Sequence, residues 1–212
     1  MSRRLPIYLL LDVSGSMQGE PIESVKNGLS ILLEELRGEP QALETAYLSV
    51  ITFESVAKQV VPLTDLFSFQ EPQLNAGGST ALGDALSLTA QKISTEVIKN
   101  SADTKGDWKP MVVIFTDGEP TDDWQKGAND IKAQKAFVIA CAAGPNANDQ
   151  ILKQITESVI HLKSCSSGDI IKFFKWISSS IKTSSTKIDS GQGTANGLSE
   201  LPALPPELQI AP

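Results

Sequence analysis

Strand-length apolar runs alternate with helical patterns along the chain, and this alternation restricts the fold more than any other feature. The run PMVVIFTD at residues 110–117 is apolar almost throughout. Continuous apolar character indicates burial on both faces, as in a parallel sheet covered by helices. Similar runs predict strands at residues 6–12, 46–53, 136–143 and about 159–163. The alternation therefore predicts an α/β fold, with a doubly wound, mostly parallel sheet and helices on both faces.

Amphipathic segments fill the gaps between these runs. Residues 19–38 place apolar side chains at helical spacing, with Pro21 in the first turn and Gly38 at the end. Further helices are predicted after Thr80 and near residues 123–134, 149–157 and 168–183. One strand departs from the parallel order. Residues 56–62 follow residues 46–53 after a break that allows only a hairpin, so we expect one antiparallel edge strand.

The chain is predicted to be one domain with a tail. Residues 1–183 carry the alternating pattern, whereas residues 184–212 contain three glycines, four prolines and no aromatic residue. A segment of this composition buries little apolar surface, so we predict a flexible tail. Two interpretations of the segment LPALPP at residues 201–206 stay open: an unstructured terminus and a short docking peptide in polyproline II form.

Composition excludes several functional classes. The formal net charge is −7 and no long Lys/Arg cluster occurs, which argues against binding to nucleic acid or anionic lipid. No apolar run reaches the roughly 20 residues of a membrane span. The two cysteines, Cys141 and Cys165, lie far apart in apolar surroundings and form no CxxC motif. We interpret them as buried free thiols of a reducing compartment and predict a cytoplasmic location.

Oxygen-bearing side chains gather in three loops at predicted strand–helix junctions. The loops are residues 12–16 (DVSGS), residues 77–80 (GGST) and residues 116–118 (TDG). Carboxylates and hydroxyls without nitrogen or sulfur suit a divalent cation, with Mg²⁺ first and Mn²⁺ or Ca²⁺ as alternatives. Each loop alone has a simpler interpretation: Thr80 as a helix N-cap, or TDG as a turn. All three together, in this order, indicate a metal site.

These three motifs resemble those of the von Willebrand factor type A domain and its metal-ion-dependent adhesion site. The resemblance spans roughly residues 5–183 and implies a Rossmann-like fold. It implies that Ser14 and Ser16 bind the cation directly, Thr80 directly or through water, and Asp12 and Asp117 often through water. The second loop usually reads GGT in this family, and here it reads GGST. We align Thr80 with the family threonine because Ala81-Leu82-Gly83 follows it, and Ser79 stays an alternative ligand.

Within the family, the segments IYLLLDVSGSM, FESVAKQVVPLT and TDGEPTDDW are most similar to the bacterial TerY-type proteins of tellurium resistance. That resemblance implies a scaffold or adaptor in a stress-response system. It also implies a kinase or a phosphatase encoded nearby as a partner.

A binding function is favoured over catalysis. Haloacid-dehalogenase-type phosphatases, the enzymatic alternative, need a second carboxylate two residues after the first, and Ser14 occupies that position. No base is available for a serine nucleophile, since His161 is the only histidine and lies in a predicted strand. We therefore predict a non-enzymatic, metal-dependent module whose protein partner supplies an acidic side chain to the cation. Trp124, beside the third loop, is predicted either to anchor that partner or to begin a helix as a buried residue.

Overall fold

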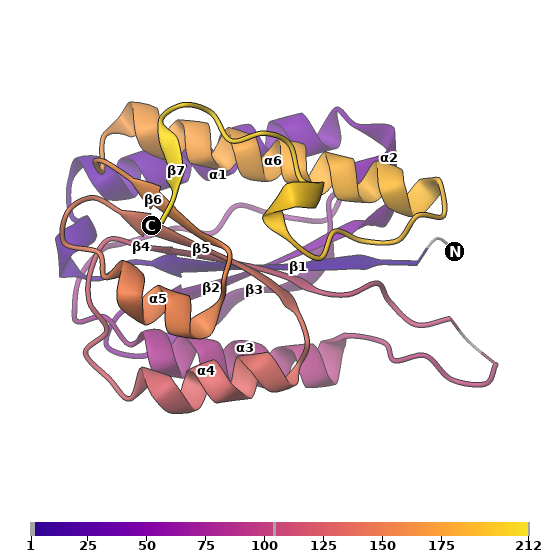
Figure 1. The fold of residues 1–212 in the computed structure, drawn as a ribbon, viewed down its shortest axis with the longest axis horizontal. Helices are drawn as coiled ribbons and strands as arrows, with labels where there is room; N and C mark the ends of the chain where they lie inside the picture. The colour runs from indigo at the N-terminus through magenta and orange to yellow at the C-terminus, as the bar shows by residue number, and fades with distance from the viewer. Residues whose placement is uncertain (1–2, 104, 212) are drawn as a thin grey trace.

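The computed structural model describes residues 3–103 and 105–211, and these form a seven-stranded sheet with helices on both faces (Figure 1). The strand order is β3-β2-β1-β4-β5-β6-β7. Neighbouring strands from β2 to β6 pair in parallel, and β3 pairs antiparallel with β2. The strands are β1 (Leu5–Asp12), β2 (Ala46–Phe53), β3 (Ala57–Asp65), β4 (Met111–Thr116), β5 (Phe137–Ala143), β6 (Val159–Leu162) and β7 (Leu208–Ile210).

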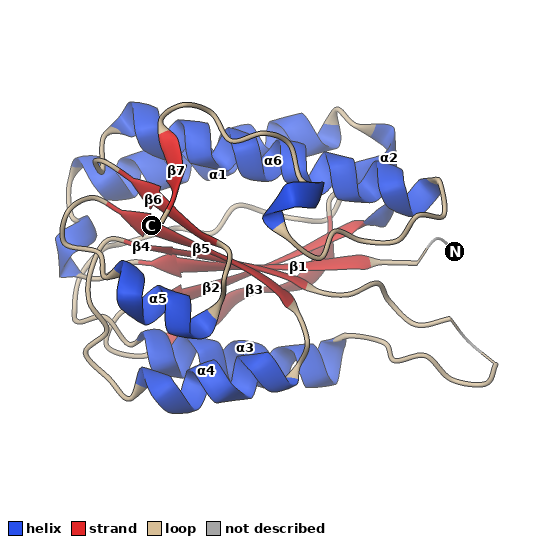
Figure 2. Cartoon of the chain, viewed as in Figure 1, coloured by secondary structure: helices blue, strands red, loops and turns tan. Residues whose placement is uncertain are grey.

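Two helical layers enclose the sheet (Figure 2). One layer contains α1 (Glu20–Arg37), α2 (Pro40–Thr45) and α6 (Ser167–Asp189), and the other contains α3 (Leu82–Glu96), α4 (Trp124–Ala133) and α5 (Asp149–Ile155). Each face of the sheet has its own apolar core, which explains why β1 and β4 are buried along their whole length. No helix in the described part of the chain combines the length and apolar character needed to cross a membrane.

The predicted fold class is confirmed, including the antiparallel edge strand β3. α1 begins after Gly19, whose φ of 85° lies in the left-handed region, has Pro21 in its first turn, and is followed by Gly38. Its apolar stripe packs against α6 and the sheet. Two short elements, α2 and β7, were not predicted.

The C-terminal segment differs from the prediction. The predicted boundary at residue 183 is wrong, because it falls inside α6. Beyond that helix the chain returns across α6 (Figure 1). Leu201 and Leu208 are buried there, and Trp176 donates its indole N–H to the carbonyl oxygen of Pro202 at 3.0 Å. β7 pairs antiparallel with β6. A few spaced apolar side chains and a strand edge thus give the segment a packed arrangement in place of the flexible tail predicted for residues 184–212.

The topology brings the predicted site residues to one edge of the sheet. β1 and β4 are neighbours at the position where the strand order reverses, with β2 beyond β1 and β5 beyond β4. Leu11 pairs with Phe115, so Asp12 and Thr116 end adjacent parallel strands at the same edge. Open α/β sheets bind ligands outside the carboxyl ends of their strands at such a reversal.

Candidate metal centre

Asp12 is fully buried, and two hydrogen bonds fix its carboxylate. Oδ1 accepts from the backbone N–H of Ser14 at 2.8 Å, and Oδ2 accepts from the hydroxyl of Thr116 at 2.6 Å. The first bond folds the loop back over the end of β1, and the second joins β1 to β4. The carboxylate is therefore held in one orientation behind the loop that carries the two serines.

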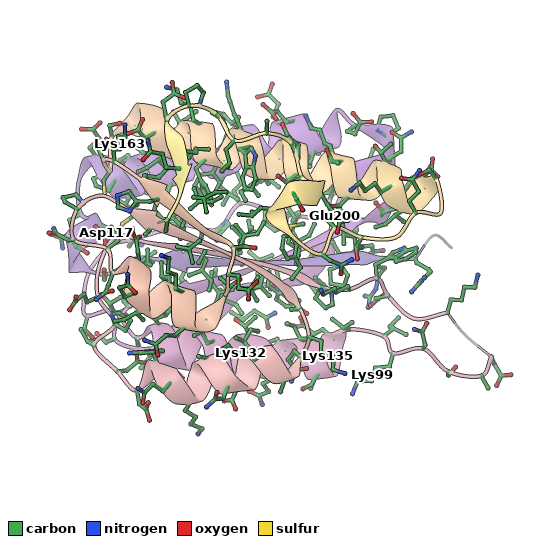
Figure 3. The ribbon with its side chains drawn as sticks, in the orientation of Figure 1. Lys99, Asp117, Lys132, Lys135, Lys163 and Glu200 are labelled. Carbon is green, nitrogen blue, oxygen red and sulfur yellow. The ribbon has the colours of Figure 1, made fainter. Side chains whose placement is uncertain are left out.

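The hydroxyls of the three loops converge in front of this carboxylate. The Oγ atoms of Ser14 and Ser16 lie 3.0 Å apart, and Ser16 donates to Oδ1 of Asp117 at 2.7 Å. A Cβ atom placed on Gly118 would lie 3.7 Å from Oγ1 of Thr80 and 3.9 Å from Oγ of Ser16. All five predicted residues thus gather at one end of the sheet, where Figure 3 shows Asp117.

Main-chain hydrogen bonds attach the second loop to the first. Gly77 donates to the carbonyl of Val13 at 2.8 Å, and Gly15 donates to the carbonyl of Gly78 at 3.0 Å. Gly78 has a φ of 75°, in the left-handed region that favours glycine. These bonds fix the second loop beside the serines of the first.

Thr80 and Ser79 differ in their surroundings. Thr80 is buried, and its N–H donates to the hydroxyl of Thr121 at 3.1 Å. Ser79 is exposed, and its N–H donates to the hydroxyl of Ser55 at 3.3 Å. The structure therefore brings Thr80, and not the exposed Ser79, into the cluster of hydroxyls.

The electrostatics of the site favour a cation. Burial raises the pKa of both Asp12 and Asp117, and the Asp117 charge adds to the shift at Asp12. Neither carboxylate forms an ion pair with a basic side chain among the described residues. Two buried carboxylates without a counter-charge are costly, and a bound cation would offset that cost. No three His, Cys, Asp or Glu side chains cluster in the described chain, so hydroxyls and water would complete the ligand set.

Sequence reasoning missed the supporting contacts of two residues. Thr116 orients Asp12, and only the register of β1 against β4 reveals this contact. Asp122 accepts from the backbone N–H groups of Gly83 at 3.0 Å and Asp84 at 2.8 Å, so it satisfies the first turn of α3 from a neighbouring loop. The interpretation of Thr80 as N-cap is wrong, because Ala81 occupies that position.

The two remaining candidates, Trp124 and His161, lie outside the metal site. Trp124 is the first residue of α4, as the second of its two predicted roles requires, but it is half-buried and not fully buried against the core on that face. His161 lies on β6, with its Nδ1 atom 3.1 Å from Oδ1 of Asp149. Neither residue lies among the converging hydroxyls.

Both cysteines are free thiols. Cys141 is fully buried in β5, and Cys165 donates to the carbonyl oxygen of Ala143 at 3.2 Å. Burial raises the pKa of Cys141 well above its ordinary value of 9.0 and that of Cys165 to about 11. Thiolates are the reactive form, so neither residue is suited to be a nucleophile at neutral pH.

Alkylation of the native protein tests this assignment. At about pH 8, we expect Cys165 to react with iodoacetamide about a hundredfold more slowly than a thiol of pKa 9.0, because its thiolate fraction is about a hundredfold smaller. Mass spectrometry of timed samples measures the rate. The urea-unfolded chain is the control and should label at both cysteines within the same period. Native labelling of Cys165 at the unfolded rate would contradict the assignment.

Comparison with known proteins agrees with this geometry. The sequence model of the von Willebrand factor type A domain matches residues 7–172. The chain belongs to this family. A protein of Synechocystis sp., described only as uncharacterized, is 33% identical to this von Willebrand factor type A domain over 124 residues. The match covers 55% of the chain and 26% of that relative, so the chain spans about a quarter of its length.

Solved structures share the same domain fold. Proximal thread matrix protein 1 of the mussel byssus, solved with a zinc-occupied adhesion-site motif, has a TM-score of 0.66 at 20% identity, covering 84% of this chain and 48% of its own. A von Willebrand factor type A protein of Catenulispora acidiphila gives 0.64 at 15% identity, covering 86% and 43%. The pilus adhesin SpaC of Lactobacillus rhamnosus GG, in an open conformation, gives 0.67 at 15% identity, covering 85% and 30%. At these identities the likeness shows the fold of the domain.

Proposed function

We propose that this von Willebrand factor type A domain is a divalent-cation-dependent protein-binding module. The observation that carries the proposal is the convergence of three hydroxyls on two buried carboxylates that lack a counter-charge. Asp12, Ser14, Ser16, Thr80 and Asp117 would hold the cation. Mg²⁺ is the first candidate because all five side chains offer hard oxygen atoms. The zinc found in the mussel protein supports a divalent ion at such a motif.

The bound cation would serve as an electrostatic contact for the partner. If the two carboxylates act through water, hydroxyls and water dominate the first shell, and the ion keeps most of its charge. An acidic side chain of a partner protein would then be attracted to it at short range. The orientation of Asp12 by Thr116 and the N–H of Ser14 keeps the protein's own carboxylate in a supporting position.

An enzymatic role has less support. Ser14 occupies the position where a haloacid-dehalogenase-type phosphatase needs its second carboxylate, and this serine contacts the Ser16 hydroxyl. His161 and the two cysteines lie outside the hydroxyl cluster. We expect no hydrolysis of p-nitrophenyl phosphate above the rate of a buffer blank, in Mg²⁺ or Mn²⁺. Turnover that Asp12→Ala abolishes would favour the enzymatic alternative.

The cellular role is the most specific part of the proposal. The sequence resemblance to TerY-type proteins supports a scaffold in a bacterial stress or tellurium-resistance system, with a kinase or phosphatase encoded nearby as a candidate partner. The free thiols are compatible with a cytoplasmic location. Co-purification of the full-length protein with the products of neighbouring genes, with and without chelator, tests both the role and the metal dependence.

Removing the two serine hydroxyls tests the site without disturbing the core. We expect Ser14→Ala combined with Ser16→Ala to weaken Mg²⁺ binding at least about tenfold, because two proposed ligands are lost. The variant should keep the circular dichroism spectrum of the wild type, since both residues lie in a loop outside the two apolar cores. Isothermal titration calorimetry measures the binding.

Ser79→Ala is the matched control, because Ser79 is an exposed serine one residue away from Thr80. It should bind Mg²⁺ with the affinity of the wild type. Equal binding by the double variant and the wild type would place the metal elsewhere. A loss in Ser79→Ala equal to that of the double variant would make Ser79 a ligand.

A further inference from the structure

A groove adjoins the candidate metal centre along one side of α1. Residues 66–81 connect β3 to α3, and part of this connection crosses α1. Between them lies a cavity of about 380 Å³, lined by Lys26 and Leu29 of α1 and by residues 71–75 of the connection. A second cavity of about 250 Å³ shares Lys26, Leu74 and Asn75 with the first. The two cavities therefore lie next to each other along α1, and we refer to them together as the groove.

The groove begins beside the metal loops. The second cavity is also lined by Gln18 and Gly19, directly after the first loop, and by Ala76, directly before the second. Gln18 donates its side-chain amide to the carbonyl oxygen of Ala76 at 3.4 Å, which closes this end of the groove against the loops. A chain that reaches the metal site is thus already at one end of the groove.

One wall of the groove, residues 70–76, has main-chain N–H and C=O groups that are almost all without hydrogen-bond partners in the described chain. Gln70 to Ala76 form neither helix nor strand, and exposed Gln73 and Asn75 flank buried Leu74, as in an extended chain. Within the described chain, no amide of these residues donates a hydrogen bond, and Ala76 is the one residue whose carbonyl accepts. An extended peptide recognises such a wall by main-chain hydrogen bonds, and pockets for its side chains add selectivity.

We propose that this groove binds an extended segment of the same protein partner whose acidic side chain binds the metal. Main-chain hydrogen bonds to residues 70–76 hold the segment, and one of its apolar side chains enters the first cavity beside Pro72 and the aliphatic part of Lys26. The inference rests on the proposed function and adds a second recognition element to it. The partner motif is therefore an acidic residue with an apolar residue at one fixed offset in an extended chain.

A peptide library tests the motif. The probe is a displayed library of peptides with a central aspartate and six randomised residues on each side, selected on the full-length protein in Mg²⁺ and eluted with EDTA. We expect the enriched peptides to share an apolar residue at one offset, on one side of the aspartate. A synthetic copy with N-methylated amides next to that residue should bind at least tenfold more weakly.

Two matched variants locate the contact. Asn75→Trp adds bulk to an exposed residue that both cavities share, and it should weaken binding of the enriched peptide at least tenfold. Asn129→Trp, an equally exposed asparagine of α4 on the other face, should stay within twofold of the wild type. Both variants should bind Mg²⁺ alone like the wild type, which shows that they fold.

Each other outcome overturns the inference. Three outcomes would exclude the groove as the peptide-binding site while Mg²⁺ binding stands. They are enriched peptides without a shared offset, no enrichment over a selection in EDTA, and equal binding to Asn75→Trp and wild type. Peptides that bind in EDTA as tightly as in Mg²⁺ would overturn the proposed function, and with it the assignment of the groove to the metal-bound partner.

Discussion

Asp12→Asn should raise the melting temperature of the metal-free protein and abolish its stabilisation by Mg²⁺. Burial raises the pKa of Asp12, so the fold favours the neutral carboxyl over the carboxylate. The stability that comes from this preference is fully present below the ordinary pKa of 3.8 and is lost as pH rises through the raised folded pKa. At neutral pH the metal-free wild type therefore contains an unfavourable buried charge.

Asparagine removes that charge and keeps the shape. Its carbonyl oxygen can still accept from the N–H of Ser14, and its amide can donate to the hydroxyl of Thr116. The wild type should gain about 2.7 kcal/mol at a Mg²⁺ concentration of 100 times the dissociation constant. For a domain of this size, that gain corresponds to about 5–11 °C in melting temperature.

Scanning calorimetry in EDTA and in saturating Mg²⁺ measures both effects at neutral pH. Asp123→Asn is the control, because Asp123 is exposed, follows Asp117 by six residues and precedes the first residue of α4. It should behave as the wild type in both buffers. An Asp12→Asn protein that Mg²⁺ stabilises as much as the wild type would contradict the proposed role of this carboxylate.

Removal of residues 190–212 should lower the melting temperature by about 4–8 °C, which corresponds to about 2 kcal/mol for a domain of this size. The segment contains buried Leu201 and Leu208, and burial of each leucine contributes about 1.5–3 kcal/mol. The conformational entropy lost when the segment is ordered offsets part of that gain. The net effect is a moderate loss of stability with the α/β core intact.

Two single substitutions separate packing from chain length. Leu208→Ala should cost about 2 kcal/mol, because Leu208 is 3% exposed. Ile210→Ala in the same strand should change stability by less than about 0.5 kcal/mol, because Ile210 is 57% exposed. Urea unfolding measures both. Equal effects of the two substitutions, together with an unchanged melting temperature of the shortened chain, would mean that the segment does not stabilise the domain.

The sheet and the long helices could be predicted because their signals are local. The apolar run ending at Thr116 and the helical stripe of α1 each fix one element, and parallel order follows from their alternation. Only the boundaries shifted, as at β3, which continues past Pro62 to Asp65 as an edge strand. Short elements such as β7 lack enough residues for a recognisable period, and their stability comes from distant partners.

The candidate site likewise has a part that could be predicted from sequence and a part that could not. Asp12, Ser14, Ser16 and Asp117 could be found because they end a strand or follow one closely. Thr80 could be found because it lies between a glycine pair and Ala81-Leu82-Gly83. The supporting contacts could not be found from sequence. Thr116 orients Asp12 only through the register of β1 and β4, and Asp122 reaches α3 from a loop that is distant in the chain. The groove along α1 likewise exists only in the folded protein.

Anomalous diffraction from a crystal grown in Mn²⁺ tests the central claim most directly. Manganese is a divalent ion that prefers oxygen ligands, and it has a strong anomalous signal. We predict one dominant anomalous peak in contact with the hydroxyls of Ser14 and Ser16, close to Thr80 and the carboxylates of Asp12 and Asp117. The peak should be absent from crystals of Asp12→Asn. A dominant peak elsewhere, or no peak at saturating Mn²⁺, would contradict the account.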